Sequence, residues 1–250
     1  TTVPNPTGVA PCAGAAIVTC FANPLILQNN VYSSEGSALY QGGIFEFTKR
    51  FTHHVSVMAN YTYSRATDTT SDYNSDYGPM DNTNLAAERA LSNFDQRHKV
   101  VFAPVVDSPW QNVVLKGFQL APIVRYNSSH PFNLLAGTDV NGDHHSTNDR
   151  PFGVGRNTGI GPDYVDLDLR LSRIVKLGER ANVQFIAESF NLTNHTNYAS
   201  VNNIVGPSLT AEGFTTAKLS GSAATPPSLP LGYTSAFPMR QIQLALRFGW

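Results

Sequence analysis

The sequence predicts an all-β protein whose antiparallel strands form part of a transmembrane β-barrel. Apolar and polar residues alternate along several stretches, most clearly over 165–172 and 241–250, and a period of two places the two kinds on opposite faces of a strand. Charged residues make up only 14% of the chain, against about 25% in an ordinary soluble domain. Short turns alternate with long polar segments between the strands, as the turns and loops of a transmembrane barrel do.

Composition excludes several other classes of protein. The mean hydropathy is -0.19, and the chain has no run of about 18 apolar residues, so a membrane helix is not expected. A barrel needs no such run, because only alternate residues of its strands face lipid. The formal net charge of -1 gives no support for a nucleic-acid partner.

The first part of the chain, residues 1–34, is rich in turn-forming residues. We expect it to form an extracellular loop region ahead of the strands, which occupy 35–250. Cys12 and Cys20 lie in this region, either as two free thiols or as a disulfide, and the oxidising exterior favours the disulfide. No signal peptide precedes Thr1, so we expect a processed product or a fragment of a longer protein.

The first two strands are expected over 39–47 and 55–64. Lys49 and Arg50 end the first strand, and His53 and His54 form a short turn. Apolar and aromatic residues occupy alternate positions of the second strand, which predicts one apolar face. A long polar loop is expected to follow, over about 66–96.

The third and fourth strands are expected over 97–106 and about 113–127. Asp107, Ser108 and Pro109 provide the short turn between them. Pro122 is a defect in the fourth strand, because proline cannot donate a hydrogen bond to a neighbouring strand. A second long polar loop, about 128–162, follows.

The fifth and sixth strands show the sharpest alternation. Val165, Leu167, Leu169 and Leu171 alternate with polar residues, and after a short turn at 176–180 the apolar positions are Val183, Phe185 and Ala187. A third long loop covers about 193–236. We expect the apolar residues of both strands to face outward, toward lipid.

The closing strand ends the chain at an aromatic residue. Leu244, Leu246, Phe248 and Trp250 form its apolar stripe, and we expect them to be the signal that the outer-membrane assembly machinery recognises. The strands number about seven, whereas bacterial single-chain barrels have an even number. An open sheet would also leave two unpaired edges in lipid. The sequence therefore predicts the C-terminal part of a larger barrel that lacks its upstream strands.

Several segments resemble the C-terminal end of TonB-dependent receptors, in particular the Oar-like group found in Acidobacteria. The matching segments are 40–50, 61–64, 92–98, 148–151, 190–198 and 240–244. The resemblance covers about 36–250, and it departs from the usual terminal Phe at Trp250. It implies a barrel of about 22 strands in the outer membrane of a Gram-negative bacterium. It also implies an N-terminal plug and the TonB complex as partners, which this chain would contact through missing parts, and energy-coupled uptake of an unidentified ligand.

The polar face of the fifth and sixth strands is expected to line the lumen. Its charged and amide residues are Asp166, Asp168, Arg170, Gln184 and Glu188. They form either a substrate path or an ion-paired lining that contacts the missing plug. We favour the lining, since any large barrel needs such residues.

One loop resembles the start of a calcium site. Asp139, Asn141 and Asp143 have the D-x-N-x-D spacing, but His144 and Arg150 stand where an EF-hand has Gly and Glu. This excludes a complete EF-hand. A looser Ca²⁺ site that includes Asp149 is one alternative, and a solvated, turn-forming loop is the other, which we favour.

The main alternative function is a secreted all-β adhesin or ligand-binding sandwich, whose apolar faces would be buried against each other. A sandwich, however, requires neither an aromatic C-terminus nor alternation of short turns and long loops. No Ser/His/Asp set has the spacing of a catalytic site, so we expect no enzymatic activity and no bound cofactor.

Overall fold

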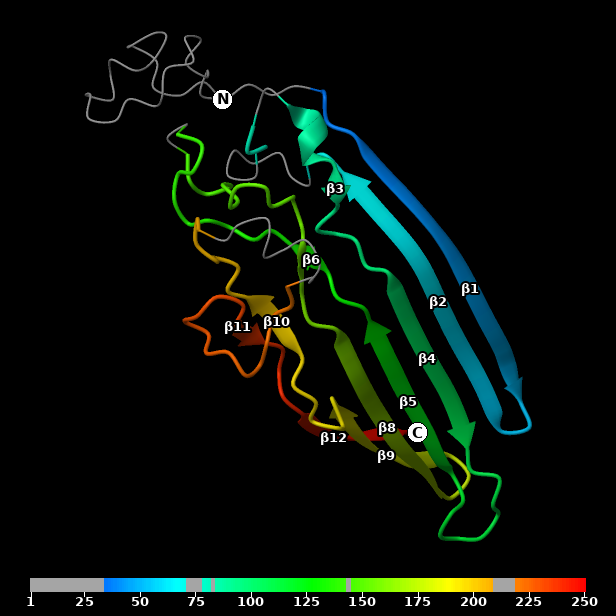
Figure 1. The fold of residues 1–250 in the computed structure, drawn as a ribbon. Coiled ribbons are helices and arrows are strands. Elements are labelled where there is room, and N and C mark those ends of the chain that lie inside the picture. Colours follow the sequence, from blue (N-terminus) through cyan, green and yellow to red (C-terminus); the bar gives the residue numbers. More distant parts are fainter. Residues whose placement is uncertain (1–33, 71–77, 82–83, 143–144, 209–218) are drawn as a thin grey trace.

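The protein contains one large, open antiparallel sheet (Figure 1). The computed structural model describes residues 34–70, 78–81, 84–142, 145–208 and 219–250. The sheet order follows the chain order, as the sequence predicts. Its long strands are β1 (Ala38–Thr52), β2 (Val55–Asp68), β4 (His98–Asp107), β5 (Phe118–Asn127), β8 (Tyr164–Leu177), β9 (Ala181–Phe190) and β12 (Gln241–Gly249).

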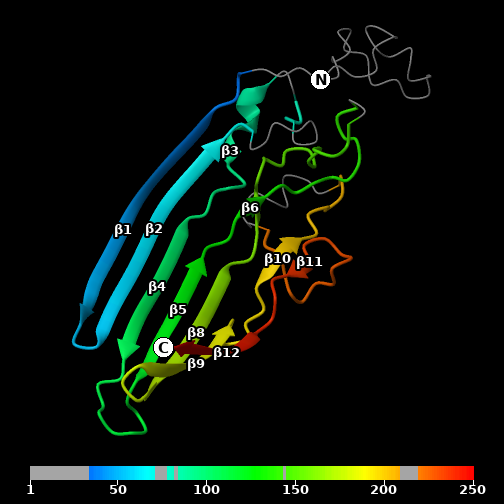
Figure 2. The same cartoon turned by 180° about the vertical axis from the view of Figure 1, so that it is seen from behind.

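The long loops carry short elements that the polar composition does not predict. β3 (Ala90–Leu91) pairs with the end of β2, and a 3-10 helix, η3 (Leu85–Glu88), precedes it. Two further two-stranded sheets join β6 (Pro131–Phe132) to β7 (Gly159–Ile160) and β10 (Tyr198–Val201) to β11 (Tyr233–Ala236). All three long loops lie at one end of the sheet and the short turns at the other, which the reverse view also shows (Figure 2).

Several strands are longer than a membrane requires. β1 has 15 residues and β2 and β8 have 14, whereas a tilted strand crosses a bilayer with about 9–11. β1 continues through Lys49 and Arg50, which the sequence analysis wrongly placed beyond its end. Among the described residues, no helix is long and apolar enough to cross a membrane.

The short turns have the backbone that tight hairpins need. His53 and His54 have φ values of 51° and 64°, and Thr52 pairs with Val55 across them. Two successive positive φ values are the mark of a type I′ hairpin turn, whose twist matches that of the strands. Between β8 and β9, Gly178 supplies the positive φ of 78°.

The fourth strand begins later than the sequence predicts, at Phe118 instead of about 113. Residues 112–117 form a turn in which Asn112 accepts a hydrogen bond from the Lys116 backbone N–H at 2.9 Å. Pro122 does lie in the strand. The register places it opposite Pro104, between the paired residues Phe102–Val124 and Val106–Leu120, where the β4–β5 pairing is interrupted. Two residues without an N–H therefore share one gap in the ladder.

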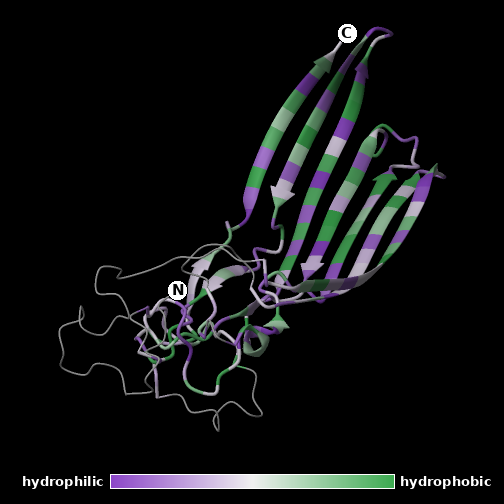
Figure 3. Ribbon diagram, turned by 90° about the horizontal axis from the view of Figure 1, so that it is seen from above, coloured by the Kyte–Doolittle hydropathy of each residue, from purple (hydrophilic) through white to green (hydrophobic). Residues whose placement is uncertain are grey.

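The cross-strand register separates two faces of the curved sheet (Figure 3). One, the apolar face, carries Val124 opposite Leu167, Leu171 opposite Ala187, and Leu244 opposite Ala187 on its other side. The other, the polar face, carries Arg125 opposite Asp166, Arg170 opposite Glu188, and Glu188 opposite Gln243. Neighbouring residues of each strand alternate between these faces.

Most of the apolar face is not covered by protein; the exception is Val183, which was expected to face lipid but is only 8% exposed between Val175 and Phe248. Leu244 is 78% exposed and Trp250 is 97% exposed, and large apolar residues of β1, β5, β8 and β9 are exposed with them. In the described part of the chain, the buried hydrophobic residues are Leu134, Ala136, Val154 and Val183, and the first three lie in the second long loop. The protein therefore buries little apolar surface of its own, and a continuous apolar face of this kind indicates an interaction with another apolar phase.

Candidate functional site

The candidate site has two parts, the polar face of the sheet and the layer of long loops at its end. On the polar face, Arg125 of β5 contacts two carboxylates of β8. Its Nε donates to Asp166 Oδ2 at 3.1 Å, and its Nη2 lies 2.5 Å from Asp168 Oδ2. Asp168 also accepts the backbone N–H of Asn191 at 2.9 Å. The two carboxylates are thus held by a cation and by the start of the third long loop.

A second ion pair lies on the same face, nearer the short turns. Arg170 Nη1 is 3.3 Å from Glu188 Oε1, and both side chains are partly exposed. Gln184 lies opposite Arg247 of β12 on this face. The five polar residues that the sequence predicts to line the lumen therefore share one face. Arg125, Gln243 and Arg247 lie on the same face.

The loop layer is organised by a pair of buried arginines. Arg150 donates two hydrogen bonds to the carboxylate of Glu88, at 2.6 and 2.9 Å, with 7% and 2% of the two side chains exposed. Arg156 pairs with Asp68, the last residue of β2, and its Nε donates to the Glu88 carbonyl at 2.9 Å. Bidentate pairs of this kind fix both position and orientation, so they tie the second loop to the first.

Side-chain amides complete the connection between these two loops. Asn148 Nδ2 lies 3.0 Å from the carbonyl oxygens of both Gly78 and Pro79. Asn157 Nδ2 donates to the Leu91 carbonyl at 2.7 Å. These amides satisfy backbone oxygens of the first loop, including one at the end of β3.

The third long loop is fixed by asparagines that follow β9. Asn197 forms two hydrogen bonds with the backbone of Val165, donating to its carbonyl at 2.8 Å and accepting from its N–H at 2.9 Å. Asn191 and Asn194 have φ values of 50° and 53°, which Asn tolerates better than most residues. The loop therefore folds back onto the start of β8.

The candidate calcium loop uses its oxygens for backbone hydrogen bonds. Asp139 Oδ1 accepts the N–H of Gly142 at 2.7 Å, and Asp149 Oδ2 accepts the N–H of Val140 at 2.5 Å. Asn141 Nδ2 donates to the Met80 carbonyl at 2.7 Å. Asp143 lies outside the described residues, and within them no group of three or more acidic, His or Cys side chains could hold a metal ion. The described side chains are used as in a turn-forming loop, and a Ca²⁺ site that includes Asp143 stays a prediction.

The predicted disulfide between Cys12 and Cys20 lies outside the described residues.

His130 connects the second loop to the first. The amide nitrogen of Gln96 lies 3.0 Å from His130 Nε2 and donates to the Ser128 carbonyl at 3.1 Å. Because an amide nitrogen can only donate, the ring nitrogen has to be unprotonated to accept. Burial lowers the pKa of His130, and the positive charge of Lys99 lowers it further.

We expect acidification to loosen this junction. The folded pKa of His130 lies below the unfolded value of about 6.5, so the unfolded loop binds more protons between the two values. The contribution of His130 to stability is complete above about pH 6.5 and is lost as the pH falls through the folded pKa. Limited proteolysis of the folded protein across this range should show the loops becoming more cleavable. The variant His130→Gln should lose that pH dependence. If the variant became more cleavable on acidification to the same extent as the original protein, the role assigned to His130 would be wrong.

A comparison with protein families agrees with this architecture. The family model described as an outer membrane beta barrel domain matches residues 3–155 and 151–243, which is most of the chain. The chain belongs to this outer-membrane β-barrel family. No curated protein and no solved structure matches it.

Membership of this family places the protein in the outer membrane, in association with its lipid. The exposed apolar face is the surface suited to that association. A secreted sandwich would bury this face under a second large sheet, and the described residues form only two further sheets, each of two short strands.

Sequence reasoning missed the residues that organise the loop layer. Glu88, Arg156 and Asp68 were assigned no role, and Arg150 was considered as a residue that disrupts a calcium motif and as part of a segment that resembles the receptor family, but not as an ion-pair partner. The available signal was the segment 148–151, which carries part of the family resemblance and supplies both Asn148 and Arg150.

Proposed function

We propose that this chain is the C-terminal part of a TonB-dependent receptor that takes up a ligand across the outer membrane. The observation that carries the proposal is the ion-paired polar face, taken together with the segments that resemble the receptor family. Arg125 with Asp166 and Asp168, and Arg170 with Glu188, place fixed charges along β5, β8 and β9. A large barrel filled by a plug needs polar groups of this kind to contact it.

The segments that resemble the receptor family support the same proposal. Segments 92–98 and 190–198 lie where the first and third long loops meet the sheet, and segment 148–151 ties the second long loop to the first. A layer of fixed extracellular loops suits the capture of a ligand above a barrel.

The open sheet implies further strands in the complete protein. β1 and β12 are its edges, and an unpaired edge is not viable in lipid. We infer that upstream strands close the barrel. We also infer that the exposed stripe of Leu244, Leu246, Phe248 and Trp250 is the signal that the assembly machinery recognises before the free edge of β12 pairs with an upstream strand.

Cross-linking in living cells tests the proposal. The full-length protein, treated with formaldehyde in cells and purified from outer membranes, should be recovered covalently attached to TonB. A receptor already known to use TonB in the same cells serves as the positive control. Failure to recover TonB with this protein, while the control receptor is cross-linked, would overturn the proposed function without affecting the barrel assignment.

A further inference from the structure

The turn between β4 and β5, residues 108–117, differs from the other short turns. Trp110, Val113 and Val114 are 56%, 86% and 70% exposed, and the turn contains Lys116 but no acidic residue. By contrast, the turn between β8 and β9 is Gly178, Glu179 and Arg180, which is polar. Large exposed apolar side chains gathered in one turn indicate a contact surface.

The turn has a fixed conformation. The Ser108 N–H donates to the Phe118 carbonyl at 2.8 Å and closes the turn. Asn112 Oδ1 accepts the N–H of Leu115 at 2.8 Å. Gly117 has a φ of +78°, and a Cβ at this position would lie 2.6 Å from the Ile174 carbonyl oxygen. The backbone that presents the exposed side chains therefore has a defined conformation.

Arg173 holds this turn on the apolar side of the sheet rim. It lies opposite Phe118 in the register, two residues along from Leu171 on the apolar face. Its guanidinium carbon is 5.0 Å from the centre of the Phe118 ring, and its Nη2 donates to the Val113 carbonyl at 2.5 Å. The turn thus lies at the edge of the surface that contacts lipid.

Both tryptophans of the chain lie at this end of the sheet. The chain contains only two, Trp110 just after β4 and Trp250 just after β12, and these strands run in the same direction. Tryptophan prefers the boundary between hydrocarbon and headgroups. The short turns of outer-membrane barrels face the periplasm, so this boundary belongs to the inner leaflet.

We propose that residues 108–117 form an interfacial anchor that inserts Trp110, Val113 and Val114 into the inner leaflet of the outer membrane. Lys116, at the end of the turn, then binds the phosphate of an anionic phospholipid such as phosphatidylglycerol, because a basic side chain beside inserted apolar residues is attracted to anionic headgroups. This inference depends on the membrane location of the protein and is independent of TonB.

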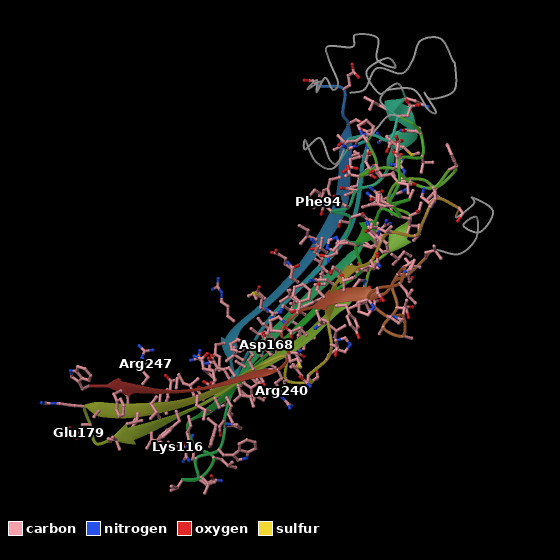
Figure 4. The ribbon with its side chains drawn as sticks, turned by 90° about the vertical axis from the view of Figure 1, so that its left-hand side faces the viewer. Phe94, Lys116, Asp168, Glu179, Arg240 and Arg247 are labelled. Atoms are coloured by element: carbon pink, nitrogen blue, oxygen red, sulfur yellow. The ribbon has the colours of Figure 1, made fainter. Side chains whose placement is uncertain are left out.

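Fluorescence quenching tests the anchor. An environment-sensitive fluorescent amino acid is placed at Val113 of the full-length protein in phosphatidylethanolamine vesicles, with the same substitution at Glu179 as the control. Figure 4 places Lys116 and Glu179 at the same end of the sheet. Spin-labelled lipid should quench the probe at 113 several-fold more strongly than iodide does, and iodide should quench the probe at 179 more strongly. Heat-modifiable migration on gels shows that each variant is folded.

A second comparison tests the lipid class. Adding phosphatidylglycerol to the vesicles should increase lipid quenching at 113, and Lys116→Gln should abolish that increase. Equal iodide quenching at 113 and 179 would overturn the anchor. A probe at 113 that neither quencher reaches would also overturn it, because it would indicate contact with protein. An increase that persists in Lys116→Gln would overturn the assignment of the phosphate site.

Discussion

Replacing Leu244 by Arg should destabilise the folded barrel by about 2–4 kcal/mol, the cost of a charged residue near the middle of a bilayer on the lipid face. Leu244 lies at the centre of β12 and is 78% exposed on the apolar face. The guanidinium of the new arginine would have to lose its water or distort the lipid around it. Chemical unfolding of the full-length protein in vesicles measures the loss.

Gln243→Arg is the matched control, because the two residues are neighbours at nearly the same depth. Gln243 lies on the polar face opposite Glu188, where a new guanidinium would find a carboxylate. We expect a change well below that of Leu244→Arg. Equal destabilisation by the two variants would contradict the assignment of the faces to lipid and lumen.

Removing the carboxylate of Glu88 should open the loop layer. Glu88→Ala leaves Arg150 buried without its bidentate partner, and breaking a buried pair in this way costs about 3–5 kcal/mol. The cost falls on the first and second long loops and not on the strands. Hydrogen exchange should therefore accelerate in the loops at 78–91 and 145–157 while β8 and β9 stay protected.

Glu188→Ala provides the comparison for this prediction. It removes the pair with Arg170 on the polar face, where both side chains are partly exposed, and such pairs contribute about 0–1 kcal/mol. If Glu88→Ala changed exchange no more than Glu188→Ala, the buried arginines would not organise the loops.

The long strands could be predicted because their signal is local. A period of two in β8 and β12 reports that one side of the strand faces an apolar phase and the other a polar one, and no distant residue is needed to interpret it. Residues 113–115 misled the prediction for the opposite reason. Three apolar residues in a row suit a strand, but Asn112 and Gly117 give them a turn conformation and leave them exposed.

The loop layer could not be predicted because its contacts are long-range. Arg150 and Glu88 are 62 residues apart, and Arg156 and Asp68 are 88 apart, so no spacing rule connects them. The calcium motif cannot be interpreted from spacing alone for a similar reason. Its spacing describes where the carboxylates occur, whereas their role depends on nearby backbone N–H groups, which Asp139 and Asp149 accept.

Spin labels along β12 determine whether the apolar face contacts membrane lipid. Labels are placed singly at each position from 242 to 248 of the full-length protein in vesicles, and their collisions with oxygen and with a water-soluble nickel complex are measured. Collisions with oxygen should exceed those with the nickel complex for labels at Ile242, Leu244, Leu246 and Phe248. They should not do so at the intervening positions, which gives a period of two. Uniform accessibility along the strand, or preferential contact of the nickel complex with a label at position 244, would contradict lipid contact by the apolar face.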